Sequence, residues 1–96
     1  MKNSFTVSGK VVKYPGAPWH FLSLSRKVSA RIGKLHQRKG KWWYAPVYAR
    51  IGQTTWKISL WPKREAGIYL LMVTAAVRKK ENIFEDDNVR VIVTLT

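Results

Sequence analysis

Hydrophobic and polar residues alternate near both ends of the chain. In residues 5–12 every second side chain is apolar or is glycine, which is the two-residue period of a half-buried β-strand. The same period over residues 88–96 predicts a final strand. The residues expected to face inward are Phe5, Val7, Gly9 and Val11 in the first strand and Val89, Val91, Val93 and Leu95 in the last.

Two short helices are predicted between these strands, each preceded by an apolar strand. Ser25 can cap a helix over residues 26–35 that ends before Gly40, and Thr74 can cap a second helix over residues 75–83. The preceding strands cover residues 19–24, after a turn at Pro15-Gly16, and residues 68–73, whose unbroken apolar run indicates burial on both faces. The inward positions are Val28, Ile32 and Leu35 at the first helix and Val73, Ala76, Val77 and Ile83 at the second.

Residues 40–62 hold four of the five tryptophans and predict a β-hairpin. Gly52 and Gln53 suit a two-residue type II′ turn, because glycine occupies its first central position. This turn places Ala49 opposite Trp56, Val47 opposite Ile58 and Ala45 opposite Leu60, so small residues face large ones on a core side. By the same alternation Trp43 and Trp56 are structural. The outer side then carries Trp42, Tyr44, Tyr48, Arg50, Lys57 and Trp61.

These elements indicate a mainly β fold: a small closed or partly open β-barrel of six or seven strands with two short α-helices. Residues 21–28 and 70–77 share one plan, an apolar strand followed by a Ser or Thr cap and a valine three residues later. This similarity suggests two strand-helix-strand halves related by pseudo-symmetry. The length of 96 residues fits one domain over residues 1–96.

Charge is the most unusual feature of the composition. Eighteen Lys and Arg stand against five Asp and Glu, and all but one of the basic residues lie in residues 1–80, together with a single acid. Such an imbalance is expected of a protein that meets nucleic acid or another polyanion, and it is also compatible with a general effect on solubility. There is no cysteine, which excludes disulfides and thiol chemistry. With no long apolar run, we expect a soluble, cytoplasmic protein that does not enter membranes.

The chain resembles the domain of unknown function 1905 family of small bacterial domains. The similarity rests on an F-x-V opening strand, W-H-F at residues 19–21, I-G-Q-T-T-W-K-I-S-L-W-P at 51–62, and G-I-Y-L-L-M-V-T-A-A-V-R-K at 67–79. The resemblance implies a compact β-barrel with two short helices, no established activity, and a frequent companion domain linked to bacteriocin protection. This chain has Asp86-Asp87 where the family has Gly-Asp, so a turn that favours glycine is expected to be costlier here.

No catalytic or metal site is predicted, and no cofactor is expected. His20 and His36 lie sixteen residues apart without carboxylates at ligand spacing, and no strained nucleophile turn of the G-x-S-x-G type occurs. The adjacent acids Glu85, Asp86 and Asp87 lack an EF-hand loop around them. We therefore expect a protein that is not an enzyme.

Arg78 has two open interpretations. It follows the apolar residues 75–77 within the family-like stretch, so it can form a buried structural ion pair or face a cleft and hold an anion with its planar guanidinium.

The outer aromatic side of the hairpin predicts a binding surface. Rings offer stacking faces to bases, and interleaved Lys and Arg neutralise phosphates, which together give sequence-tolerant single-strand binding. The candidate residues are Trp42, Tyr44, Tyr48, Arg50, Lys57 and Trp61, extended by Arg26, Lys27, Arg31 and Lys34 of the first helix. Three alternatives stay open: cover by a helix, contact with a second copy or a separate companion domain, and a small-ligand pocket in the barrel.

Overall fold

The computed structural model describes residues 3–96, apart from the side chain of Arg38. In chain order the elements are β1 (Ser4–Lys10), β2 (Val12–Lys13), β3 (His20–Ser23), α1 (Arg26–His36), β4 (Gln37–Arg38), β5 (Lys41–Trp42), β6 (Ala45–Ile51), β7 (Thr54–Lys63), the 3-10 turn η1 (Arg64–Ala66), β8 (Ile68–Met72), α2 (Ala75–Glu81) and β9 (Asn88–Leu95).

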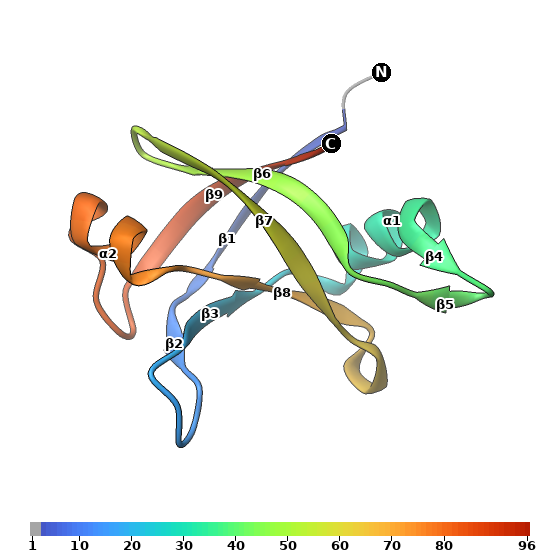
Figure 1. Ribbon diagram of the computed structural model, residues 1–96, viewed down its shortest axis with the longest axis horizontal. Helices are drawn as coiled ribbons and strands as arrows, with labels where there is room; N and C mark the ends of the chain where they lie inside the picture. Colours follow the sequence, from blue (N-terminus) through green and yellow to red (C-terminus); the bar gives the residue numbers. More distant parts are fainter. Residues whose placement is uncertain (1–2) are drawn as a thin grey trace.

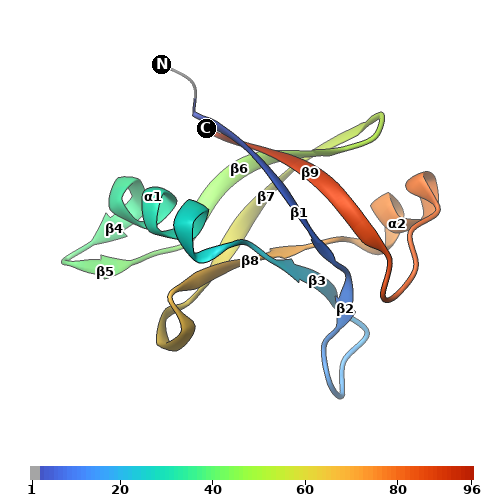
Figure 2. The same cartoon turned by 180° about the vertical axis from the view of Figure 1, so that it is seen from behind.

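Seven strands form one antiparallel sheet in the order β1-β9-β6-β7-β8-β3-β2, and β4 pairs with β5 as a separate small hairpin. The two ends of the strand order, β1 and β2, are consecutive in the chain and separated by Val11 alone. The sheet therefore curls until its edges meet in one bent strand, and the predicted small β-barrel is confirmed. Both views place α1 and α2 at opposite ends of the barrel (Figures 1 and 2).

The bend at Val11 is held by the turn that leads into β9. The Val11 N–H donates to the Asp87 carbonyl at 2.9 Å, and the Val11 carbonyl accepts from the Asp86 N–H at 2.7 Å. The Val11 side chain is fully buried. The predicted first strand therefore has its expected inner face but is two strands rather than one.

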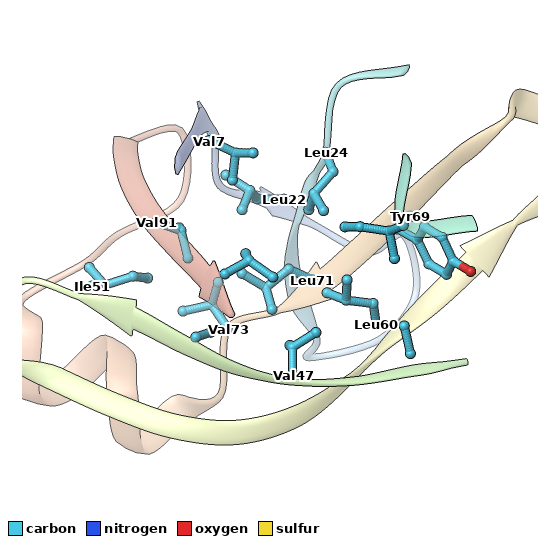
Figure 3. Packing of buried hydrophobic residues seen from close by; sticks show 14 of the residues in the cluster. Val7, Leu22, Leu24, Val47, Ile51, Leu60, Tyr69, Leu71, Val73 and Val91 are labelled. Atoms are coloured by element: carbon cyan, nitrogen blue, oxygen red, sulfur yellow. The ribbon is translucent and has the colours of Figure 1, made fainter. Parts of the chain in front are cut away.

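The core lies inside the barrel, where side chains from opposite strands meet (Figure 3). The inner face of β6, with Ala45, Val47 and Ala49, has no exposed surface, as the small-against-large pairing predicts. β8 is buried on both faces, also as predicted. Its Tyr69 is the largest fully buried residue, and its N–H donates to the hydroxyl of buried Ser29 in α1 at 2.9 Å.

The β6–β7 hairpin has the predicted register throughout, from Ala45 opposite Leu60 to Ile51 opposite Thr54. Gly52 alone of its two turn residues has a positive φ, 58°, as a type II′ turn requires. Glu81 at the end of α2 contacts this turn and accepts a 2.6 Å hydrogen bond from the Thr54 hydroxyl. The turn is thus held by a carboxylate that the sequence did not assign to it.

Both predicted caps are present, and both helices begin at the residues where they were expected to begin. The hydroxyls of Ser25 and Thr74 accept from the N–H groups of Val28 and Val77 at 3.2 and 3.4 Å. Helix α1 ends at His36, close to its predicted end at residue 35, and residues 37–42 then form a hairpin whose two turn residues, Lys39 and Gly40, have positive φ.

The predicted inner faces of the helices were partly wrong. Leu35 is 61% exposed, because the close approach of Gly33 to Trp42 turns Ser29, Ile32 and Gly33 inward and leaves Leu35 on the flank. Ala76 is exposed because the seven-residue α2 buries Val77 alone within its bounds.

Candidate binding surface

Six aromatic rings form a continuous series of contacts on the outside of the barrel, which we call the aromatic row. Successive ring centroids lie 5.9 to 6.1 Å apart, and every pair is tilted or edge-to-face. In spatial order its members are Phe21, Tyr14, Trp19, Trp61, Tyr44 and Trp43. All except Phe21 are between 39% and 49% exposed, so ring surface is open to a ligand.

One end of the row is built by the turn between β2 and β3. Tyr14 and Trp19 flank Pro15, Gly16 and Pro18, and the Tyr14 N–H donates to the Trp19 carbonyl at 2.7 Å. The positive φ of Gly16, 77°, closes the turn. The two rings are thereby held beside Trp61 of β7, whose plane is inclined at 71° to that of Trp19.

The other end of the row corrects a prediction about two adjacent tryptophans. Trp42 was expected on the outer face and Trp43 inside, but Trp42 is half-buried against the core while Trp43 is exposed. The chain between β5 and β6 is irregular at residues 43–44, so strand alternation does not extend back from β6. Trp42 stacks on Tyr69 with planes 2° apart and lies against Gly33, which removes it from the candidate stacking face.

Tyr69 and Arg64 fix the position of the exposed end. The Tyr69 hydroxyl donates to the Trp43 carbonyl at 2.7 Å, and Arg64 Nε donates to the Trp42 carbonyl at 2.9 Å. The Arg64 guanidinium carbon lies 5.9 Å from the centre of the Trp43 ring, within cation–π range. Burial raises the pKa of the Tyr69 phenol above its usual value of 10.0, and the Arg64 charge works against that rise. The neutral phenol is thus kept as a hydrogen-bond donor.

A groove with a cavity volume of about 220 Å³ lies at the Phe21 end of the row, where Phe21, Tyr14, Trp19 and Trp61 line it. Its walls are mostly apolar, and its two charged residues are Lys63 at the end of β7 and Glu65 in the 3-10 turn. The lining residues are Tyr14, Trp19, Phe21, Trp61, Pro62, Lys63, Glu65, Leu70 and Met72. This is an aromatic-walled groove with a donor and an acceptor on its lining.

Three further predicted residues lie on the outer face of the β6–β7 hairpin, as expected. Tyr48 is 47% exposed and stands between Lys57 of β7 and Thr94 of β9 in the register. Arg50 is exposed, and its Nε donates to the Gly52 carbonyl at 3.0 Å. Because Tyr44 and Tyr48 are four residues apart, about 13 Å along a strand, this basic segment adjoins the aromatic row rather than belonging to it.

The basic residues of α1 are separate from the aromatic row. Arg26, Lys27, Arg31 and Lys34 are all exposed, and Arg31 lies over the Phe5 ring of β1 with 5.5 Å between guanidinium carbon and ring centre. Helix α1 is nearer the viewer in Figure 2, whereas β7, which carries Trp61, is in front in Figure 1. The structure therefore does not join these four side chains to the rings.

Arg78 has a structural contact, although not the ion pair that was considered. Its Nη1 donates to the Val73 carbonyl at 2.7 Å, which ties α2 to the end of β8. Arg78 also lines a shallow hollow with His20, Lys79 and Glu85. His20 Nδ1 lies 3.1 Å from the Pro18 carbonyl, so that nitrogen carries the proton.

Within residues 3–96, no three His, Cys, Asp or Glu side chains are grouped so that they could hold a metal ion. Over the same part of the chain, neither helix has the length and apolar character needed to cross a bilayer.

A family model for a domain of unknown function, DUF1905, matches residues 8–93. The chain belongs to the DUF1905 family. Neither the comparison with curated proteins nor the comparison with solved structures gave a match. The whole aromatic row falls inside the matched segment, so the surface is built on the family domain itself. The family description carries no activity, and the function has to be argued from this surface.

Sequence reasoning missed four of the six rings of the aromatic row, because Trp43 was expected inside, and it also missed the charged residues beside the rings. Tyr14, Trp19 and Phe21 were read only as parts of a turn and a strand, and Lys63, Arg64 and Glu65 were not singled out. A signal was available, because two aromatic residues that flank a short Pro-Gly turn must project near each other. That Trp61 would meet them depends on the β7–β8–β3 order, which the sequence does not contain.

Proposed function

We propose that this domain is a non-enzymatic binding module that holds single-stranded nucleic acid across the aromatic row. The observation that carries the proposal is a contiguous series of exposed rings on a chain with a net charge of +13. Exposed rings in contact with one another give successive stacking surfaces, each worth about 1–3 kcal/mol per base.

Basic residues lie beside the rings: Lys63 lines the groove with Trp61, and the Arg64 guanidinium lies over the Trp43 ring. Lys63 and Arg64 follow Trp61 in the chain, and Lys57 and Arg50 continue along the outer face of the hairpin. The Nε of Arg64 and of Arg50 is engaged by a backbone carbonyl, which orients each guanidinium and leaves its terminal nitrogens to reach phosphate. A single strand with its bases on the row and its phosphates on these residues satisfies both features.

Little base selectivity is expected from stacking alone, because every base has a π-face. Neither helix is suited to reading a DNA groove, since α1 packs Ser29, Ile32 and Gly33 against the barrel and α2 is only seven residues long. The proposal is therefore restricted to unpaired nucleic acid.

The test is fluorescence anisotropy with a labelled mixed-sequence single-stranded DNA of about 20 nucleotides, titrated from 50 to 200 mM salt. Binding should be saturable at 50 mM salt, and six phosphate contacts would weaken it about three-hundredfold over that range. Trp61→Ala and Trp19→Ala should each weaken binding by about five- to a hundredfold with the salt slope unchanged. Lys63→Ala should instead reduce the slope by about 0.7.

Phe84→Ala is the matched control, because Phe84 is an aromatic residue with 64% exposure that takes no part in the row. Its affinity should equal that of the unaltered protein. Absence of saturable binding at 50 mM salt overturns the proposal, as does normal binding by both tryptophan variants. A salt-insensitive dimer in sedimentation that protects Trp61 would assign the row to contact between copies instead.

A further inference from the structure

Glu65 has an exceptional position for an acidic residue of this chain. It is the only Asp or Glu in residues 1–80, and the structure places it on the lining of the aromatic groove beside Lys63. A carboxylate there repels phosphate, so general polyanion binding gives no reason for it. Its position is explained if the group that enters the groove offers a hydrogen-bond donor.

The size and walls of the groove suit one planar base. Its cavity volume of about 220 Å³ is below the range of about 300–1,000 Å³ that drug-sized ligands occupy. Tyr14, Trp19 and Trp61 supply rings on its sides, while Leu70 and Met72 lie on neighbouring positions of β8. A base between these walls presents its polar edge to the charged lining residues.

Resting on the proposed function, we infer that the groove takes one unpaired base and selects those with an exocyclic amino group. The Glu65 carboxylate accepts from the amino group, in the way that Glu accepts from cytosine N4 in direct readout. Lys63 lies where it can donate to a ring acceptor of the same base or to the adjoining phosphate. Cytosine and adenine satisfy the carboxylate with their amino groups, and thymine has none.

The experiment compares 12-nucleotide oligo-dC with oligo-dT at pH 7.5 and 50 mM salt, since both are flexible pyrimidine strands. The unaltered protein should bind oligo-dC about fivefold more tightly, a modest ratio because Glu65 is exposed to solvent. Glu65→Met removes the acceptor at similar side-chain length, so the preference should disappear and oligo-dT should bind more tightly than before. Glu85→Met, which removes a carboxylate outside this groove, should strengthen both oligonucleotides equally and keep the fivefold ratio.

The outcomes separate the two proposals. Equal binding of oligo-dC and oligo-dT by the unaltered protein overturns the selection and leaves single-strand binding standing. A preference that survives Glu65→Met also overturns it, since the amino group would then be read elsewhere. Failure of both oligonucleotides to bind overturns the proposed function itself.

Discussion

Leu22 of β3 and Leu71 of β8 lie directly opposite each other in the barrel wall, and both are fully buried. The two residues are 49 positions apart, and the same interval relates the hydrogen bonds on either side of them. The Leu24 N–H donates to the Tyr69 carbonyl, and 49 positions on the Val73 N–H donates to the His20 carbonyl, both at 2.9 Å. The pair therefore marks a local two-fold relationship between the halves of the chain.

The relationship extends through both halves. Val12 pairs with Phe21 in the first half, and Trp61 pairs with Leu70 in the second, again 49 positions on. The caps Ser25 and Thr74 bond the N–H groups of Val28 and Val77 in the same way. The faint sequence similarity of residues 21–28 and 70–77 thus corresponds to a repeated strand-helix unit whose two copies pair with each other.

Truncation of the central pair should reveal this shared packing. Leu22→Ala and Leu71→Ala should each lower the free energy of unfolding by about 3 kcal/mol, because each leaves a cavity in the wall of the core. The double variant should lose at least about 0.5 kcal/mol less than the sum, since the two cavities merge. Urea denaturation measures all three. Leu35→Ala, at an exposed position, is the control and should change stability by under about 0.5 kcal/mol. If the losses of Leu22→Ala and Leu71→Ala added strictly in the double variant, direct packing of the two side chains would be contradicted.

Gly33→Ala should destabilise the protein, although alanine normally favours a helix by about 1 kcal/mol over glycine. A Cβ at this position would overlap the indole of Trp42, which is itself stacked on Tyr69 and cannot easily move. We expect a loss of about 1–3 kcal/mol in the free energy of unfolding from overpacking. Thermal unfolding measures it, and Lys34→Ala on the exposed side of α1 is the control that should not unfold earlier. Increased stability of Gly33→Ala would show that the indole has room.

The β6–β7 hairpin was predictable because its determinants are local. A glycine at the first turn position fixes the register, and the register fixes which of Tyr48 and Trp56 faces outward. The helix caps Ser25 and Thr74 were predictable for the same reason, because each bonds an N–H group only three residues further along the chain. In each case a few adjacent residues determine the geometry, and the structure agrees.

The aromatic row was only partly predictable, because its members are brought together by long-range strand order. Trp19 meets Trp61 since β3 and β7 are both neighbours of β8. The exchange of Trp42 and Trp43 depends on two irregular residues before β6 and on a glycine in α1, none of which alters the alternating pattern. Local periodicity contains no information about such contacts.

The buried phenol of Tyr69 predicts a loss of stability at high pH. Its pKa is raised in the folded protein, chiefly by burial, so the unfolded chain releases this proton first as the pH passes about 10. The stabilisation of the fold that this difference in pKa provides is fully present below pH 10 and declines above it. Tyr69→Phe should be about 1 kcal/mol less stable at pH 7, having lost the hydrogen bond to the Trp43 carbonyl.

Above pH 10 the stability difference between the two proteins should shrink, because the phenylalanine variant has no proton to release there. Urea denaturation at pH 7, 9, 10 and 11 measures the free energy of unfolding of each protein. Both proteins have the same lysines, so the effect of lysine titration cancels when one free energy is subtracted from the other. A constant difference across this range would mean that the phenol titrates with its ordinary pKa in the fold.

Asp86 and Asp87 give the sharpest local test, because the same substitution should have opposite effects at adjacent positions. Asp86 has a φ of 73°, in the left-handed region that costs most residues about 1–2 kcal/mol. Asp86→Gly relieves this strain and keeps the backbone hydrogen bond to Val11, so stability should rise by up to about 1 kcal/mol. Asp87→Gly removes the carboxylate that accepts from the Phe84 N–H at 2.8 Å and should cost about 1 kcal/mol.

Both changes remove one negative charge, so any difference in melting temperature between them reports the backbone and the hydrogen bond rather than the net charge. Equal shifts of the two variants would contradict the left-handed geometry at Asp86.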